Sequence, residues 1–219
     1  MSGPTTVGPT TGGTTTADRR RALGSKGNRT RQRLLDAAER VFAELGYHDA
    51  SVVKITEAAG VAQGTFYIYF PGKREIFEHL VEDLNRRVRR AMSAAADAGE
   101  SRLAAERLGF AAYFAFVAEH PGLYRIMRQA ELVSPGTLRA HYDRIVSGYT
   151  ERLRAAMDAG DIPAGEPEVM AWALMGLGEM VGMRWVLWSD GAPVPEPVQA
   201  DTAAVVARIL GVADEHSGR

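Results

Sequence analysis

Apolar residues in the first part of the chain recur at the three- and four-residue spacing of amphipathic helices. The first such stretch carries Leu34, Leu35, Ala38, Val41, Phe42 and Leu45, and Gly46 ends it. Ser51 can cap a short second helix, which Gly60 closes. A third short helix, residues 63–70, follows after only two residues and is broken by Pro71-Gly72. Two short helices joined by so brief a turn predict a helix-turn-helix domain over residues 28–80.

The remainder of the chain also follows helical spacing, and no segment alternates apolar and polar residues for long enough to indicate a strand. A longer helix is predicted from Lys73 to about residue 96. Further helices are predicted over residues 103–119, 122–130, 136–159, 166–189 and 199–210. The sequence therefore predicts an all-α protein, with a three-helix N-terminal domain, a connecting helix over residues 81–98 and a C-terminal helical bundle over residues 99–213.

The N-terminal segment has the composition of a disordered chain. Residues 1–17 hold seven Thr, four Gly and two Pro, with Val7 as the one aliphatic residue larger than alanine. Residues 18–33 carry seven Lys or Arg against one Asp. We predict a disordered basic arm over residues 1–27. Its charge has two readings that stay open, a solvated stretch beside a helix start or a contact with the DNA backbone.

Composition changes this picture little. The absence of cysteine excludes disulfides, thiolate nucleophiles and cysteine-based zinc sites, and fits a reducing cytoplasm. No apolar segment behind the N-terminal basic residues suggests export, so we expect a cytoplasmic protein. Residues 1–90 carry 15 basic and 10 acidic side chains, whereas residues 91–219 carry 11 and 17. A basic front half is expected where only that end meets a polyanion.

The helix predicted over residues 63–70 has an unusual outer face. At about 100° per residue, Phe70 and Ala62 lie about 40° to either side of Phe66 and face the core. Gly64 and Ile68 point directly away from it. This face suits the DNA major groove, where glycine permits a close backbone approach and isoleucine can meet a thymine methyl. The alternative is that Ile68 packs beneath a neighbouring helix.

Polar side chains flank that face. Gln63 and Thr65 lie near the positive N-terminus of the helix and can reach base edges or phosphates. Tyr67, Tyr69 and Lys73 carry donors suited to phosphate oxygens, and Lys73 begins the next helix. Aromatic residues on a short helix are often core residues, but Phe66 and Phe70 already fill that role.

At these residues the chain closely resembles the tetracycline-repressor (TetR) family of bacterial regulators. The resemblance is carried by Thr30, Leu34 to Ala38, Val41-Phe42, Leu45-Gly46-Tyr47, Ser51-Val52, Ile55, Ala58 to Val61 and Gly64 to Lys73. It spans about fifty residues with the turn spacings intact, and it does not extend into the second half.

The resemblance implies a homodimer that binds a double-stranded DNA operator and whose C-terminal domain dimerises and binds a small-molecule effector. It places Gln63, Gly64, Thr65, Tyr67, Ile68 and Tyr69 on the recognition helix, Thr30 and Lys73 on phosphates, and Ser51 at the start of the second helix. One position departs from the family, which usually has Ser or Thr where this chain has Ala62. A cap worth about 1 kcal/mol is therefore missing.

Residues 169–188 form a run of twenty with only Glu179 and Arg184 charged. Its length matches a membrane span, but a charge at the centre and the lack of basic flanks favour a buried helix and no membrane. Gly178 and Gly182 permit a close helix crossing. We predict that this helix and residues 199–210 pair with their symmetry mates in a four-helix dimer interface.

Aromatic and sulfur side chains of the rear half are candidates for an effector pocket, with plain core packing as the alternative for each. The candidates are Tyr113, Phe116, Tyr124, Met127, Tyr149, Trp172, Met175 and Glu179, with Phe114 and Tyr142 of the same kind. Glu179 has two open readings, an ion pair with Arg184 or Arg125 or a polar anchor for the effector.

The sequence thus predicts a sequence-specific transcriptional regulator, a repressor released from a palindromic operator by a small, largely apolar ligand. A dimeric regulator without an effector is the alternative. An enzyme finds no support, because nucleotide-binding and hydrolase motifs are absent and the five histidines lack metal spacing, so no cofactor or metal is expected. Ligand binding between the rear helices is expected to tilt the helix of residues 73–96 and change the spacing of the two recognition helices.

Overall fold

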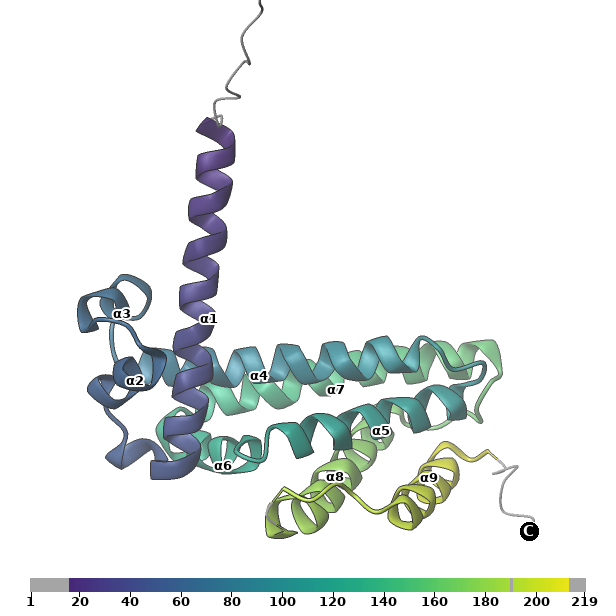
Figure 1. Ribbon diagram of the computed structural model, residues 1–219. Helices are drawn as coiled ribbons and strands as arrows, with labels where there is room; N and C mark the ends of the chain where they lie inside the picture. Colours follow the sequence, from purple (N-terminus) through teal and green to yellow (C-terminus); the bar gives the residue numbers. More distant parts are fainter. Residues whose placement is uncertain (1–15, 190, 213–219) are drawn as a thin grey trace, which may run out of the picture.

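The computed structural model describes residues 16–189 and 191–212, which are helical without a strand and confirm the all-α prediction. Figure 1 shows a long first helix rising from an elongated body made of the later helices. The α-helices are α1 (Thr16–Asp49), α2 (Val52–Ala59), α3 (Gln63–Tyr69), α4 (Lys73–Ala96), α5 (Arg102–Glu119), α6 (Leu123–Val133), α7 (Pro135–Ala159), α8 (Pro167–Trp185) and α9 (Glu196–Leu210). A 3-10 turn, Leu187–Ser189, follows α8.

Helix α1 is longer than the sequence pattern predicts. It begins at Thr16, so the part of the predicted disordered arm from residue 16 to residue 27 is helical, and residues 1–15 lie outside the described residues. Extending an existing helix avoids the cost of nucleation, and Ala, Arg and Leu in this segment are good helix formers. The helix axis breaks at Gly46, whose φ of 75° favours glycine. At its other end, the first turns of α1 stand clear of the body (Figure 1).

The turn between α2 and α3 forms as the sequence predicts. The Ser51 hydroxyl accepts a hydrogen bond from the Lys54 amide at 3.2 Å and caps α2. Gly60 adopts the left-handed conformation at φ 63°, and its amide and that of Val61 donate to carbonyls of the last turn of α2 at 3.1 and 3.0 Å. Ala62 begins α3 without a side-chain cap.

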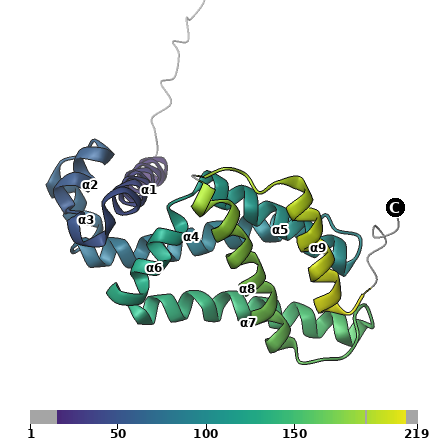
Figure 2. The ribbon, with the colours of Figure 1, turned by 90° about the horizontal axis from the view of Figure 1, so that it is seen from below.

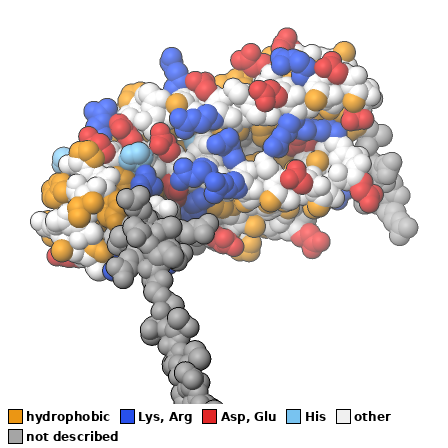
Figure 3. Space-filling model, turned by 90° about the horizontal axis from the view of Figure 1, so that it is seen from above, with side chains coloured by type: hydrophobic (Ala, Val, Ile, Leu, Met, Phe, Trp, Pro, Cys, Tyr) orange, Lys and Arg blue, Asp and Glu red, His pale blue; other side chains and the backbone are white. Residues whose placement is uncertain are grey.

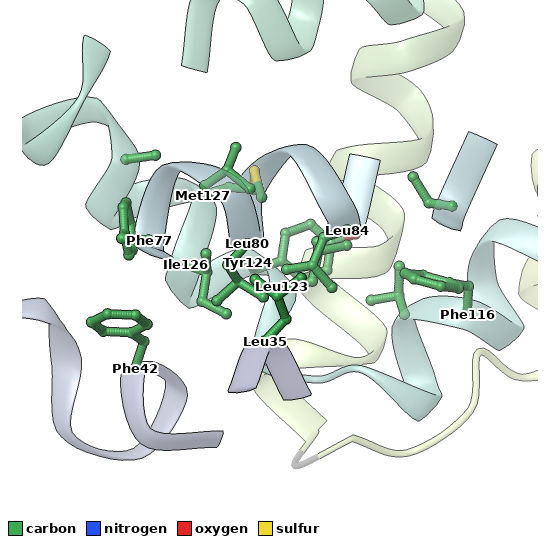
Figure 4. Packing of buried hydrophobic residues seen from close by; sticks show 14 of the residues in the cluster. Leu35, Phe42, Phe77, Leu80, Leu84, Phe116, Leu123, Tyr124, Ile126 and Met127 are labelled. Carbon is green, nitrogen blue, oxygen red and sulfur yellow. The ribbon is translucent and has the colours of Figure 1, made fainter. Parts of the chain in front are cut away.

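One hydrophobic core extends from the first helices into the rear of the molecule. The ring of Phe42 in α1 meets that of Phe77 in α4 edge to face, with centroids 5.0 Å apart. Leu80 and Leu84 continue this core along α4 toward Ile126 of α6 (Figure 4). Because α4 belongs to both halves of this core, its position couples the front helices to the rear ones.

Helix α8 packs against α5, α7 and α9 on one side and exposes the other, so the helix predicted to be buried is buried on one side only within the chain. Figure 2 shows α8 crossing the space between α5 and α7, and α9 lies against α5 and α8. A Cβ atom on Gly178 or Gly182 would meet the rings of Phe110, Tyr113 or Tyr124. The close approach predicted for these glycines is therefore made within the chain, to α5 and α6. Among the described residues, no helix is long and apolar enough to span a bilayer.

Candidate functional site

The outer face of α3 is solvent-exposed in the orientation that its sequence predicts. Phe66 and Phe70 are fully buried, whereas Ile68 is 76% exposed and Tyr67 58% exposed. Ala62, which was also predicted to face the core, is exposed, because its extended backbone precedes the first helical residue. Apart from its adjacent residues and the backbone of its own helix, a Cβ atom added to Gly64 would have no atom within 4 Å. The alternative that Ile68 packs beneath a neighbouring helix is therefore wrong. An exposed apolar side chain beside an open backbone is a surface on which another molecule can pack closely.

Arginines of α1 hold the end of α2 in place behind this face. Arg33 donates to the carbonyl oxygen of Ala59 at 2.6 Å, and Arg40 donates to that of Ala58 at 3.3 Å. These carbonyls belong to the last turn of α2, where no intrahelical amide is available to them. The orientation of the α2–α3 pair relative to α1 is thus set by hydrogen bonds as well as by packing.

The other predicted contact residues lie around α3. Gln63 is exposed, and Thr65 and Tyr69 are half-buried. Thr30 donates from its hydroxyl to the Lys26 carbonyl at 3.1 Å, an exposed bond that it would have to exchange in order to donate to a phosphate. Figure 3 shows Lys and Arg side chains gathered on the face from which α1 rises, with acidic side chains interspersed along the body.

Lys73 does not face solvent as a free phosphate ligand. Its ammonium group donates to the carbonyl oxygens of Tyr47, His48 and Ala50 at 2.7, 3.1 and 2.9 Å. An ammonium has three N–H donors, and all three have partners here. The prediction that Lys73 binds a phosphate is therefore corrected: this side chain closes the C-terminal end of α1.

A cavity of about 170 Å³ lies between α4, α5, α6, α7 and α8. Of the predicted ligand residues, those lining it are Tyr113, Tyr124, Met127, Tyr149, Met175 and Glu179. Phe116 does not line it, because this ring packs against the imidazole of His120 at 4.4 Å. Trp172 lies on the outer side of α8 and is 44% exposed. Both residues sit on helices of the cavity but on faces turned away from it.

Four arginines that were not among the predicted ligand residues also line the cavity. They are Arg89, Arg102, Arg144 and Arg152, and all except the partly buried Arg102 are exposed. A signal was present in the four-residue spacing of Arg144, Gly148 and Arg152, which places them on one side of α7. The exposed side of the cavity, between α4 and α7, is thus positively charged.

At the end near the start of α5, a buried carboxylate meets this basic rim. Glu106 pairs with Arg102 and accepts a hydrogen bond from the Tyr149 hydroxyl at 3.3 Å. Burial raises the pKa of Glu106, against the opposing effect of Arg102. The Nε of Arg102 is buried without a hydrogen-bond partner in the described part of the chain. Arg152 donates to the Ser93 hydroxyl at 2.8 Å.

The opposite end of the cavity holds a second polar cluster. Tyr142 donates from its hydroxyl to Glu179 Oε1 at 3.0 Å, and the hydroxyls of Tyr113 and Tyr124 lie 2.8 Å apart. Burial, followed by other effects that include the nearby charge of Glu179, raises the pKa of all three tyrosines. Gly182 leaves room for the Tyr124 hydroxyl.

The ion pair considered for Glu179 does not form. Arg184 instead lies over the ring of Trp185, with its Cζ 5.4 Å from the centroid. Arg125 donates to the Ala43 carbonyl at 3.3 Å. The partner of the Glu179 carboxylate in the described residues is a tyrosine.

Helix α6 joins the cavity to the front helices. Tyr124 and Met127 face the cavity, whereas Gln129 contacts the end of α1. The Gln129 side chain accepts from the Tyr47 amide at 2.5 Å and donates to the Phe42 carbonyl at 3.4 Å. A displacement of α6 by a ligand would therefore act directly on the helix that carries the α2–α3 pair.

Comparison with known proteins agrees with this arrangement. The family model described as bacterial regulatory proteins, tetR family, matches residues 34–80. The chain is 47% identical over 68 residues to the uncharacterized HTH-type transcriptional regulator YdgC of Bacillus subtilis (strain 168), a match that covers 31% of this chain and only 35% of that relative. It is 35% identical over 136 residues to the fatty acid metabolism regulator protein of the same organism, covering 61% of this chain and 68% of the relative.

The fold also matches a solved structure, that of the transcriptional regulator FadR from Bacillus subtilis in complex with stearoyl-CoA. The TM-score is 0.69 at 23% identity, and the match covers 84% of this chain and 99% of that one. This likeness establishes a common arrangement of the helices in both halves of the chain.

Proposed function

This chain belongs to the tetR family of bacterial regulatory proteins, and from that premise we propose that it is a repressor that leaves its operator when it binds an anionic amphiphile. The observation that carries the DNA-binding part is the outer face of α3, where Gly64 is open and Ile68 is 76% exposed. Such a face is costly in water and is useful in a major groove, where it can contact thymine methyls. The protein acts by binding and has no enzymatic step of its own.

We assign DNA contacts to the exposed and half-buried residues of α3 and its neighbours. They are Gln63, Gly64, Thr65, Tyr67, Ile68 and Tyr69 in the groove and along its edges, and Thr30 and Ser51 at phosphates. Lys73 is left out because its donors are used within the chain. A homodimer would present two α3 helices to successive major grooves, which requires a near-palindromic operator.

The dimer interface that we propose is formed by α8 and α9 with their symmetry mates. Helix α8 and the turn after it expose four large apolar side chains, Val169, Trp172, Met180 and Trp188. Exposed apolar residues concentrated on one helix are typical of a surface that another chain covers.

Three observations support a long-chain acyl-CoA as the effector. The cavity is lined by aromatic, Met and Leu side chains, and arginines surround its exposed side, which suits an apolar tail and an anionic head. One relative is a fatty acid metabolism regulator, and the FadR structure contains stearoyl-CoA.

The small volume of the cavity links binding of the effector to a movement of the surrounding helices. Its volume of about 170 Å³ is below the roughly 300–1,000 Å³ of typical ligand pockets. A long acyl chain can therefore enter only if the surrounding helices, α4 and α6 among them, move apart. Both helices contact the DNA-binding half, so we propose that this motion tilts α4 and changes the separation of the two α3 helices.

A regulator without an effector is the second candidate. It is favoured by the small volume of the cavity and by Glu106 and Glu179, whose carboxylates already have partners in the chain. Thermal unfolding in the presence of lauroyl-CoA or stearoyl-CoA separates the two, because a ligand that binds only the folded state raises the melting temperature. No shift with either acyl-CoA would favour the second candidate.

The DNA-binding proposal is tested by selecting bound duplexes from a random pool and comparing wild type with Ile68→Ala. We expect a near-palindromic product and a loss of about 1 kcal/mol or more on it, with little change on random DNA. Val53→Ala, at an exposed position of α2, is the matched control. An equal loss on operator and random DNA would place Ile68 outside the groove, and the absence of any preferred duplex would contradict the proposal itself.

A further inference from the structure

The polar clusters at the two ends of the cavity are well separated. Tyr142 marks one end and Tyr149 and Arg152 the other, and all three lie on α7. At 1.5 Å per residue, Tyr142 lies about 10 Å from Tyr149 and about 15 Å from Arg152 along the helix axis. A ligand whose anionic head lies at Arg102 and Arg152 therefore carries the far end of its chain toward Tyr142 and Glu179. Arg144, two residues from Tyr142 on α7, lies nearer the far end and pairs with Glu82.

The far end is an unusual place for a plain hydrocarbon tail. Glu179 Oε1 accepts the proton of Tyr142, but Oε2 has no hydrogen-bond partner among the described residues. Between the oxygens of Tyr113 and Tyr124 there is room for one proton, so the other hydroxyl of this pair has a proton to donate elsewhere. This end thus offers one unused acceptor and one unused donor, among side chains of which Tyr124 is buried and the others are half-buried.

A hydroxyl group satisfies both requirements at once. It donates one hydrogen bond, to Glu179 Oε2, and accepts another, from the tyrosine pair. An ammonium can only donate, and a terminal methyl group does neither and, by covering this end of the cavity, would shield Glu179 Oε2 from water without giving it a hydrogen bond. Resting on the proposed function, we propose that the effector is a hydroxylated acyl thioester, with its hydroxyl at the chain end opposite the anionic head.

The glycines of α8 support this assignment of the far end. A Cβ atom on Gly182 would collide with the Tyr124 hydroxyl, so the absence of a side chain there is what allows the tyrosine pair to approach α8. Glu179 lies three residues earlier on the same helix. The tyrosine pair, which supplies the donor, and Glu179, which supplies the acceptor, therefore lie at the same end of the cavity.

Isothermal titration of the full-length protein with lauroyl-CoA and with ω-hydroxylauroyl-CoA tests the inference. We expect the hydroxylated ligand to bind wild type at least tenfold more tightly, because a site built to hydrogen-bond a hydroxyl discriminates against the analogue that lacks it. In Glu179→Met this preference should fall to within twofold, and Glu179→Gln, which keeps an acceptor oxygen, should retain part of it. Glu119→Met, an exposed carboxylate outside the cavity, is the matched control and should keep the full preference.

The outcomes separate the inference from the function on which it rests. Equal affinities for the two ligands in wild type, or an undiminished preference in Glu179→Met, would overturn the hydroxyl assignment and leave an acyl-CoA effector standing. Failure of both ligands to bind would overturn the acyl-CoA effector and this inference together. If Glu179→Met does not fold, the double variant Tyr113→Phe, Tyr124→Phe removes the donor instead, and the preference should again fall.

Discussion

The ammonium nitrogen of Lys73 lies 2.7 Å from the carbonyl oxygen of Tyr47 and 4.5 Å from the centre of its ring. The first residue of α4 is thereby fastened to the last turn of α1, through both a charge-assisted hydrogen bond and a cation–π contact. Since α3 lies between these two helices in the chain, this contact closes the loop that contains the recognition helix.

Replacing this lysine is expected to weaken the fold. Lys73→Met removes three hydrogen bonds from a charged donor and leaves the part-buried carbonyls of Tyr47 and Ala50 without that donor. We therefore expect a loss of about 2–3 kcal/mol in the free energy of unfolding. Urea denaturation measures it, with Lys54→Met as a control, since that exposed lysine donates to the single Asp49 carbonyl. Unchanged stability together with a DNA-binding salt slope lowered by about 0.9 would instead identify Lys73 as a phosphate ligand.

Two glycines of α8 should respond to alanine with opposite signs. A methyl group on Gly182 would collide with the Tyr124 hydroxyl, and we expect Gly182→Ala to cost about 1–3 kcal/mol through overpacking. Apart from its adjacent residues and the backbone of its own helix, a Cβ atom added to Gly176 would have no atom within 4 Å, so Gly176→Ala should gain up to about 1 kcal/mol from helix propensity. Thermal or urea unfolding of the two variants measures both. If Gly182→Ala were as stable as wild type, the close approach of α6 to α8 would be contradicted.

The stability of the protein should fall in mild acid because of His141. Burial, followed by the charges of Arg144 and Arg89, lowers the pKa of His141 to about 4, from 6.5. Its Nδ1 lies 2.7 Å from the Asn85 amide nitrogen and accepts a hydrogen bond from it, which requires the neutral ring. The unfolded chain therefore binds the proton more readily, and the stabilisation present above pH 6.5 is lost as the pH falls from 6.5 to 4.

The size of this effect is about 3 kcal/mol at most, from 1.36 kcal/mol per pKa unit. Urea unfolding of wild type and His141→Gln across this pH range would reveal it as a pH dependence that the variant lacks. His48→Gln, at an exposed position, serves as the control and should retain it. A variant with the same pH dependence as wild type would show that another group is responsible.

The helical start of α1 is expected to bind phosphates beyond those that α3 reaches. Substituting Arg19, Arg20 and Arg21 by Gln should lower the slope of log affinity against log salt by about 0.9 for each phosphate that is no longer neutralised. Operator preference should be unchanged, because backbone contacts carry no sequence information. Arg154→Gln with Arg208→Gln, exposed in the rear half, is the control. An unaltered slope would show that this basic segment is solvated and does not contact DNA phosphates.

Features that depend on neighbouring residues were predictable from the sequence. Ser51 caps α2 through the amide three residues later, and Gly60 takes the left-handed conformation within its own turn. The outward position of Ile68 follows from its angle to Phe66 along one helix. After Gly99, most of the helix ends were predicted to within three residues, because Pro and Gly mark the breaks.

What each side chain meets across the fold was decided by the tertiary structure. The sequence alone determined an all-helical chain with a helix-turn-helix and its exposed face, since these follow from local spacing and capping. Packing of helices distant in the chain turned Phe116 and Trp172 away from the cavity, brought Arg102 and Arg152 to it, and engaged Lys73 with the end of α1. Helical periodicity gives the face on which a residue lies, but the crossing of two helices determines which partner that face meets.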